Sequence, residues 1–291
     1  MYGICSAASI EQRTREVSLT TSSALPVHHD CKQCSEQFFS LKLCIPRENR
    51  NEMASPTTFN IKIYSDTICP WVCSSPFSSS NQALRSPRHQ CYLGLRTLEQ
   101  AITLFQRTYP NASRDTFRIT WSPFYLDANL PTPGILASTR IIQKNGADRA
   151  EGIKLRLKRV GQAHGIDFSF AGKVGNTKDS HRMMHLAGLK GGEVQMKLAK
   201  ELFAMHFEGD TDVTCHDDLL KASIAAGLAE NEAMEWLYSD NGGAEVDEEA
   251  QRARDSGVSS VPTFEINGRR LEGAEDASAF YQAFADIKFT V

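Results

Sequence analysis

The sequence lacks the features that mark membrane, nucleic-acid-binding and disulfide-scaffold proteins. No apolar run approaches the ~18 residues that cross a bilayer. The formal net charge of −3 gives no electrostatic footprint for nucleic acid or anionic lipid. Eight cysteines in 291 residues are too few and too unevenly spaced for a disulfide scaffold. We therefore expect a soluble globular chain with room for one large domain or two modest ones.

Targeting signals are also scarce. The N-terminal segment has no continuous apolar core and carries charged side chains where one would lie, which argues against secretion. It is rich in Ser and Thr but has no clear basic amphipathic face, so evidence for mitochondrial import is weak. We expect a cytoplasmic protein with no nucleic-acid or membrane partner. A homodimer is compatible with the sequence.

Residues 1–58 show no sustained hydrophobic period. We interpret them as disordered or as a non-native extension, and Met53 would serve as an alternative start. Cys31 and Cys34 have the spacing of half a zinc site, but a closed site needs four ligands on a folded knuckle. We therefore predict no metal site.

From residue 59 the chain is strongly patterned. Phe59, Ile61 and Ile63 alternate with polar residues, as in a strand. Residues 92–108 place apolar side chains at helical spacing, and residues 116–124 again alternate. This order predicts two parallel neighbouring strands joined by a right-handed helical crossover.

The rest of the chain is mostly helical, with a short hairpin near its end. Residues 126–243 contain four or five amphipathic segments separated by glycines, and a charged helix follows at 244–255. Asn267-Gly268 is a strong hairpin signal, and a final helix is expected over 275–286. We predict an α/β, thioredoxin-like fold whose core (59–125 and 244–291) is interrupted by an all-helical insertion.

The main chemical motif is divided in two. Cys69-Pro-Trp71 follows the first strand, and Cys91 opens the first helix, with residues 72–90 between them. Without that tract the sequence would read Cys-Pro-Trp-Cys at a helix N-terminus. Unpaired backbone N–H groups and the helix dipole there lower a thiol pKa. We predict that Cys69 attacks a disulfide and that Cys91 resolves the mixed disulfide.

Residues 72–90 have no apolar period, and their Ser and Pro content predicts a disordered loop. The tract is either a functional insertion or a retained intron. Every valine codon begins GT and glutamine can be encoded CAG, so the tract that starts at Val72 and ends at Gln90 can carry both splice signals. We favour the intron. Because Cys73 also offers a competing partner for Cys69, we predict weak or absent dithiol activity for the chain as given.

Three separated motifs carry a family resemblance. In chain order they are Ser65-Asp66-x-x-Cys69-Pro70-Trp71 with Cys91-Tyr92-Leu93-Gly94, then Asn176-Thr177-x-Asp179-x-His181-Arg182, then Gly257-Val258-x-x-Val261-Pro262-Thr263-Phe264. Residues 59–291 thus resemble the DsbA-like thioredoxin superfamily, and within it the FrnE-type dithiol oxidoreductases. The resemblance implies a thiol–disulfide oxidoreductase or isomerase acting on protein or small-molecule disulfides.

The resemblance also implies roles for residues around the dithiol. Val261-Pro262 would lie opposite it with a cis peptide bond and pair with an extended substrate. Trp71 carries no charge, unlike the histidine at that place in DsbA, so we expect a milder depression of the Cys69 pKa. Asn176 and His181 would open a helix facing the cleft. From the residues alone, Asn176 could equally be a helix cap and His181 a structural histidine.

Two other functions stay open. Related glutathione-dependent enzymes, the 2-hydroxychromene-2-carboxylate isomerases and kappa glutathione transferases, place a serine where Cys69 stands, so the cysteine argues against that activity. A thioredoxin-like binding module with an inactive site is the non-enzymatic alternative. We expect no bound cofactor, with glutathione as the one conceivable co-substrate.

Overall fold

The computed structural model describes residues 55–69, 90–273 and 276–290, which belong to a compact unit spanning Asn51–Val291. Its strands are β1 (Thr58–Ser65), β2 (Thr116–Pro123), β3 (Ile135–Leu136), β4 (Lys173–Val174), β5 (Thr263–Ile266) and β6 (Arg269–Glu272). Its helices are α1 (Cys91–Thr108), η1 (Ala112–Arg114, a 3₁₀ turn), α2 (Ala137–Asn145), α3 (Ala147–Gln162), α4 (Lys178–Lys190), α5 (Gly192–Phe207), α6 (His216–Ala226), α7 (Glu230–Leu237), α8 (Gly243–Asp255) and α9 (Ala277–Thr290).

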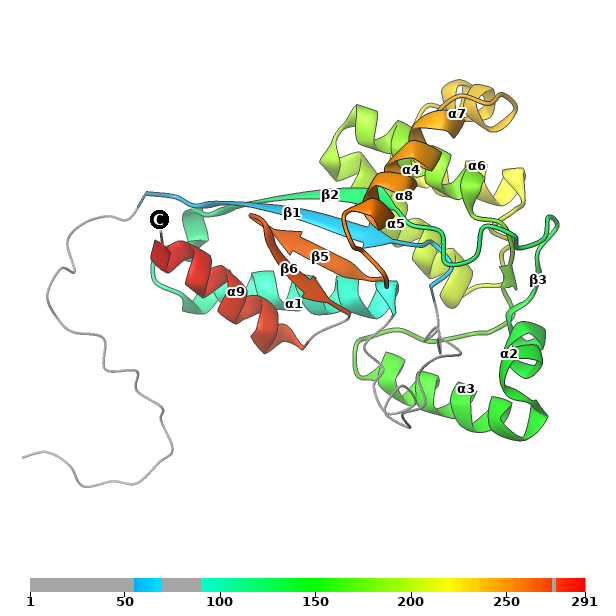
Figure 1. Cartoon of the computed structure of the whole chain (residues 1–291), viewed down its shortest axis with the longest axis horizontal. Helices are drawn as coiled ribbons and strands as arrows, with labels where there is room; N and C mark the ends of the chain where they lie inside the picture. Colours follow the sequence, from blue (N-terminus) through cyan, green and yellow to red (C-terminus); the bar gives the residue numbers. More distant parts are fainter. Residues whose placement is uncertain (1–54, 70–89, 274–275, 291) are drawn as a thin grey trace, which may run out of the picture. The chain divides into compact units, whose positions relative to one another are not determined.

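The central sheet has the strand order β2-β1-β5-β6 (Figure 1). β1 runs parallel to β2, with Phe59 beside Phe117, and antiparallel to β5. The predicted parallel pair is therefore confirmed, with α1 as the crossover that such a pair requires. Asn267 and Gly268 form the turn between β5 and β6 with φ values of 46° and 85°, as expected of an Asn-Gly hairpin.

The helices follow the predicted pattern with small shifts and one omission. α1 begins one residue before the predicted range, and α9 extends four residues past it, to Thr290. The amphipathic segments within 126–243 correspond to α3–α7. The sequence does not predict α2, or the two-residue strands β3 and β4, which are too short to show a period. The predicted limits of the helical insertion stay a prediction.

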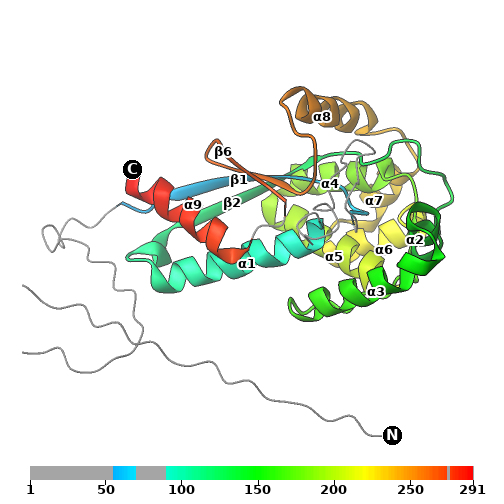
Figure 2. The same ribbon diagram turned by 60° about the horizontal axis from the view of Figure 1, so that its bottom comes forward.

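Aromatic packing fixes α1 and α9 on the sheet. Phe59 of β1, Phe105 of α1 and Phe284 of α9 are fully buried, with ring centroids 5.1–5.7 Å apart. Burial of each such ring contributes about 1.5–3 kcal/mol. The two helices lie together along the sheet, while α4, α5 and α8 contact β2 (Figure 2). The N-terminus of α1 is thereby held at the carboxyl end of β1.

Several predictions fall on residues that the structure does not describe. These are the half zinc site at Cys31 and Cys34, residues 1–54 of the predicted extension 1–58, and residues 72–89 of the tract 72–90. The end of the predicted extension is described, and Thr58 there begins β1. Within the described ranges, no group of three or more potential metal ligands comes together. No helix in those ranges is long and apolar enough to cross a bilayer.

Candidate active site

The site begins where β1 ends. Ser65 is the last residue of the strand, and its carbonyl accepts a hydrogen bond from Phe124 N–H at 3.0 Å. The chain then turns, and the Cys69 amide donates to the Asp66 carbonyl at 3.2 Å. Asp66 and Cys69 are each 1% exposed. The turn therefore carries a carboxyl group and a thiol into the interior together.

Cys91 is the first residue of α1, after an extended Gln90 at the N-cap position. The side chain of Gln90 makes no capping hydrogen bond, and the positive end of the helix dipole lies at Cys91. Tyr92 and Leu93 are buried beside Cys91, which is itself 1% exposed. The prediction that Cys91 begins the first helix is confirmed.

The structure brings Cys69 and Cys91 into contact across the undescribed tract. The two side chains are hydrogen-bonded, and the backbone N–H of Cys91 also points at the Cys69 sulfur. The thiol–thiol hydrogen bond raises the pKa of Cys69 well above its usual value, and burial raises it further. The negative charge of Asp66 acts in the same direction, whereas the Cys91 N–H lowers the pKa.

This finding corrects the expected depression of the Cys69 pKa. The expectation assumed that Cys69 lies in the first helical turn, but α1 begins at Cys91 and Cys69 remains in the preceding turn. One backbone N–H is outweighed by the neighbouring thiol, the burial and the nearby carboxylate. The described structure therefore holds Cys69 as a thiol at neutral pH.

The loop before β5 closes the other side of the dithiol. Cys69 Sγ donates to the Val261 carbonyl at 3.7 Å, and the Val261–Pro262 peptide bond is cis. Gly94 of α1 allows this approach, because a Cβ built there would lie 3.0 Å from Pro262 Cγ and 3.1 Å from Phe264. The Cys-Tyr-Leu-Gly motif thus contains a glycine that the packing requires.

His181 lies behind this turn. It is 4% exposed, and its Nε2 is 3.6 Å from Asp66 Oδ1. Its ring packs edge-on against Tyr125, with the centroids 5.3 Å apart. The sequence therefore identified a histidine that contacts the site, although it does so through Asp66.

Asn176 is placed differently. Its side-chain amide donates to the Ala128 carbonyl at 3.0 Å, and its Oδ1 accepts the Lys178 N–H at 2.9 Å, at the start of α4. These contacts match the capping alternative, with Thr177 at the formal N-cap position. Trp71, the remaining predicted substrate contact, lies outside the described residues, as does Cys73.

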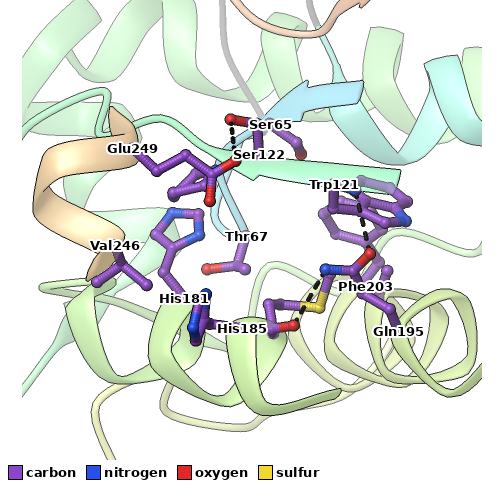
Figure 3. A pocket seen from close by; sticks show the side chains of 13 residues that line it. Ser65, Thr67, Trp121, Ser122, His181, His185, Gln195, Phe203, Val246 and Glu249 are labelled. Carbon is purple, nitrogen blue, oxygen red and sulfur yellow. Dashed lines mark hydrogen bonds between the residues drawn. The ribbon is translucent and has the colours of Figure 1, made fainter. Parts of the chain in front are cut away.

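A pocket lies beside His181 (Figure 3). The volume within it that a water molecule can reach is about 30 Å³. Ser65 and Thr67, the neighbours of Asp66, line it together with His181, while α8 contributes Glu249, whose carboxylate accepts a hydrogen bond from Ser122 at 2.9 Å. The sequence does not predict this pocket, because its lining comes from segments far apart in the chain.

A model of the DSBA-like thioredoxin domain matches residues 89–285. A search of curated proteins gives no match. A "probable DsbA oxidoreductase" from Streptomyces coelicolor is 22% identical, with 78% of this chain and 89% of that chain covered and a TM-score of 0.64.

Two further solved structures share the fold. A candidate protein disulfide isomerase from Nitrosomonas europaea is 15% identical, with coverages of 79% of this chain and 97% of that chain and a TM-score of 0.53. A 2-hydroxychromene-2-carboxylate isomerase is 16% identical, with coverages of 78% and 95% and a TM-score of 0.51. At these identities the likeness establishes the fold alone.

Proposed function

Since this chain belongs to the DsbA-like thioredoxin domain family, we propose that it is a thiol–disulfide oxidoreductase or isomerase whose reacting pair is Cys69 and Cys91. The observation that carries the proposal is the contact between these two thiols at the N-terminus of α1. In disulfide exchange by a dithiol, one sulfur atom first bonds to a substrate sulfur, and the two protein sulfur atoms then bond to each other. The two must therefore lie in contact. The contact meets that requirement despite the interruption of the motif.

The reaction proceeds through a mixed disulfide. The Cys69 thiolate attacks a substrate disulfide, one substrate sulfur leaves as a thiolate, and Cys91 then attacks Cys69 Sγ and releases the second. The Val261 carbonyl lies beside Cys69, where it can accept a hydrogen bond from the backbone of an extended substrate. We propose protein or small-molecule disulfides as substrates, with glutathione as a co-substrate and no bound cofactor.

Burial supports low activity for the chain as given. Cys69 and Cys91 are each 1% exposed, and an attacking thiol must be both accessible and ionised. We propose that a form lacking residues 72–90, in which the motif reads Cys-Pro-Trp-Cys, is the active one. A cDNA read from Trp71 to Cys91 tests the intron directly, and transcripts that all retain the tract would contradict it.

Insulin reduction and exchange with glutathione disulfide test the function. We expect turnover by the form lacking 72–90, much slower turnover by the full chain, and none after Cys69→Ser or Cys91→Ser in either form. Cys215→Ser removes a third described cysteine, at the N-cap of α6, and should leave the rates unchanged. Full activity of Cys69→Ser would refute the proposal.

The same proteins test the two alternatives. Saturable glutathione binding without disulfide turnover would favour a glutathione-dependent isomerase, although a cysteine occupies position 69. Inactivity of both forms towards every disulfide, with the fold intact, would favour a binding module with an inactive site.

A further inference from the structure

A second hollow lies in the helical region, away from the pocket beside His181. A water molecule can reach about 30 Å³ of that pocket and about 420 Å³ of the second hollow. The first volume holds little more than water, whereas the second falls in the ~300–1,000 Å³ range of ligand sites. The second hollow is lined by Ser138 of α2, by four residues of α3 and by the segment 169–171. We call it the α3 groove.

One face of α3 forms the long wall of the groove. Its four residues stand at positions i, i+3, i+4 and i+7, which share one face of a helix. They are Glu151, Lys154, Leu155 and Lys158. Leu155 is 61% exposed, with one lysine before it and one after it along the helix. Lys154 Nζ pairs with Glu151 at 2.8 Å. The wall thus offers an exposed apolar side chain between two ammonium groups.

The opposite wall is held in a strained backbone conformation. Phe170 has a φ of 65°, a left-handed value that a bulky residue rarely adopts. The Ser169 N–H donates to the Phe207 carbonyl at 2.8 Å, and the Gly172 carbonyl accepts the Ala137 N–H at 2.9 Å. Strain of this kind persists where the surrounding structure fixes it, and it clusters at ligand-binding sites. The chain is fixed on both sides of Phe170, so the groove is preorganised for a ligand.

The helices around the groove are strongly basic. α2 and α3 lie next to each other (Figure 1). Together they carry seven Lys or Arg and two Asp or Glu, which gives a net charge of +5. The whole chain has a net charge of −3, so the rest of the protein is acidic. This one-sided distribution attracts a partner of negative charge to the groove.

A protein segment fits this surface better than a membrane or a nucleic acid does. The apolar side chains of a membrane-binding helix project into the lipid, whereas Leu155 and Phe170 line a hollow. Nucleic acids are bound through several phosphate contacts, and here the acidic Glu151 stands on the same helix face as the lysines. A peptide can place an apolar side chain against Leu155 and Phe170, with carboxylates at Lys154 and Lys158.

A series of aromatic contacts connects the groove with the dithiol. The Phe170 ring stacks on Phe168, with the centroids 6.2 Å apart. Phe168 packs edge-on against Phe207 at 5.8 Å. Phe207 stacks on Tyr92 at 5.9 Å, and Tyr92 follows Cys91 in α1. About six residues of extended chain, at ~3.3 Å each, span three such contacts. A segment in the groove and a disulfide at the dithiol can therefore belong to one substrate.

We propose that the α3 groove binds an acidic and apolar segment of a disulfide-containing protein, which makes proteins preferred substrates over free glutathione disulfide. The inference rests on the proposed function. An apolar side chain of the segment packs against Leu155 and Phe170, and carboxylates on either side of it pair with Lys154 and Lys158. Exchange at the dithiol follows the same steps as before. The groove raises the concentration of the substrate disulfide near the dithiol.

Peptide binding to the full chain, followed by fluorescence anisotropy, tests the groove without use of the dithiol. One labelled peptide carries Glu-Leu-Glu between Gly-Ser segments, and the matched peptide carries Lys-Leu-Lys. We expect the acidic peptide alone to bind, and more weakly as salt is added. Lys158→Glu should weaken this binding by about 10-fold, because repulsion replaces attraction. The same variant should gain affinity for the Lys-Leu-Lys peptide. Lys221→Glu, on α6 and 69% exposed, is the control and should change neither.

The apolar part of the groove is tested with Leu155→Ser. We expect it to weaken binding of the acidic peptide by about 10-fold, since the leucine of the peptide loses its apolar contact. Leu189→Ser is the matched control, because Leu189 is 66% exposed and lies on α4. Both variants should unfold at the same urea concentration as the parent, which separates lost binding from lost folding.

Exchange rates connect the groove with the proposed function. The substrate is the acidic peptide, extended by about six residues to a cysteine in mixed disulfide with glutathione. At low concentration it should react about 10-fold faster with the reduced full chain than free glutathione disulfide does. Lys158→Glu should remove this advantage and leave the rate with glutathione disulfide unchanged. Equal rates for the two substrates in the parent chain would overturn the proposal.

Several binding results would also overturn it. These are no binding of either peptide, equal binding of both, or equal behaviour of Lys158→Glu and Lys221→Glu. Binding of phosphatidylserine vesicles or single-stranded DNA that Lys158→Glu abolishes, without binding of the acidic peptide, would identify a different partner. In each case the proposed function stands as long as glutathione disulfide is turned over. If the acidic peptide binds but no disulfide is exchanged, the proposed function fails, and the role of the groove in substrate choice fails with it.

Discussion

Gly94 provides a direct test of how tightly the site is packed. It lies in the first turn of α1, where replacement by alanine would ordinarily stabilise a helix by about 1 kcal/mol. Here the new Cβ would meet Pro262 Cγ at 3.0 Å and a Phe264 ring carbon at 3.1 Å. Phe264 is fully buried and packs edge-on against Phe280, with the centroids 4.8 Å apart. Neither contact partner can therefore yield easily.

The two effects oppose each other, and their magnitudes decide the sign. Overpacking a well-filled site costs about 1–3 kcal/mol, which exceeds the gain in helix propensity. We expect Gly94→Ala to lower the free energy of unfolding by about 1 kcal/mol, equivalent to a fall of about 2–4 °C in Tm. Displacement of Pro262 also moves the Val261 carbonyl from Cys69 Sγ, so disulfide exchange should slow.

Gly152 supplies the matched control. It lies within α3, and a Cβ built there meets nothing within 4 Å, so Gly152→Ala should stabilise the protein by about 0.5–1 kcal/mol. Urea denaturation of both variants, with the slope compared to that of the parent, measures the difference. If Gly94→Ala stabilises the protein as much as Gly152→Ala does, the argument for a close approach of α1 to Pro262 is wrong.

Three further predictions concern buried charged, titratable and thiol groups. Lys288 Nζ is 2.5 Å from Asp115 Oδ2, and these side chains are 5% and 0% exposed. Lys288→Met should therefore lower the free energy of unfolding, measured by urea denaturation, by about 3–5 kcal/mol. A loss near zero would contradict the buried pairing. Burial lowers the pKa of His206 from 6.5 to about 4, so between these values the unfolded chain binds a proton that the folded chain does not. The free energy of unfolding should therefore fall as the pH drops from about 6.5 to about 4. His206→Gln should flatten this dependence in urea titrations at several pH values. An unchanged pH dependence in that variant would contradict the lowered pKa of His206. Iodoacetamide at neutral pH should label the partly exposed Cys215 before the buried Cys69, as measured by peptide mass spectrometry, and the reverse order would contradict the burial of the dithiol.

Local patterns were enough to predict most of the elements. The alternation of Phe59, Ile61 and Ile63 reports a buried strand, and the spacing within 92–108 reports a helix, because both signals repeat over neighbouring residues. Asn267-Gly268 specifies its own turn. In contrast, β3 and β4 are two-residue segments that pair with each other. No local pattern in the sequence predicts such a pairing.

The electrostatic state of the site could not be predicted in the same way. The lowered pKa expected for Cys69 depended only on the backbone N–H groups at a helix terminus. Its pKa is set instead by the Cys91 thiol and by burial, with Asp66 adding to the rise. Likewise, His181 belongs to a motif that the sequence shows, but its contact with Asp66 joins residues 115 positions apart. Such contacts depend on how α4 packs on β2 and on the turn that follows β1.

The sequence by itself determined the strand–helix–strand unit and the position of Cys91 at the start of its helix, since hydrophobic period and turn residues are local properties. Tertiary structure alone decided that Cys69 and Cys91 meet in spite of the tract between them. It also decided that Gly94 admits Pro262, and that a carboxylate and an imidazole face each other behind the thiol. The physical reason is that distances between distant segments, and the burial that shifts a pKa, exist only once the helices have packed on the sheet.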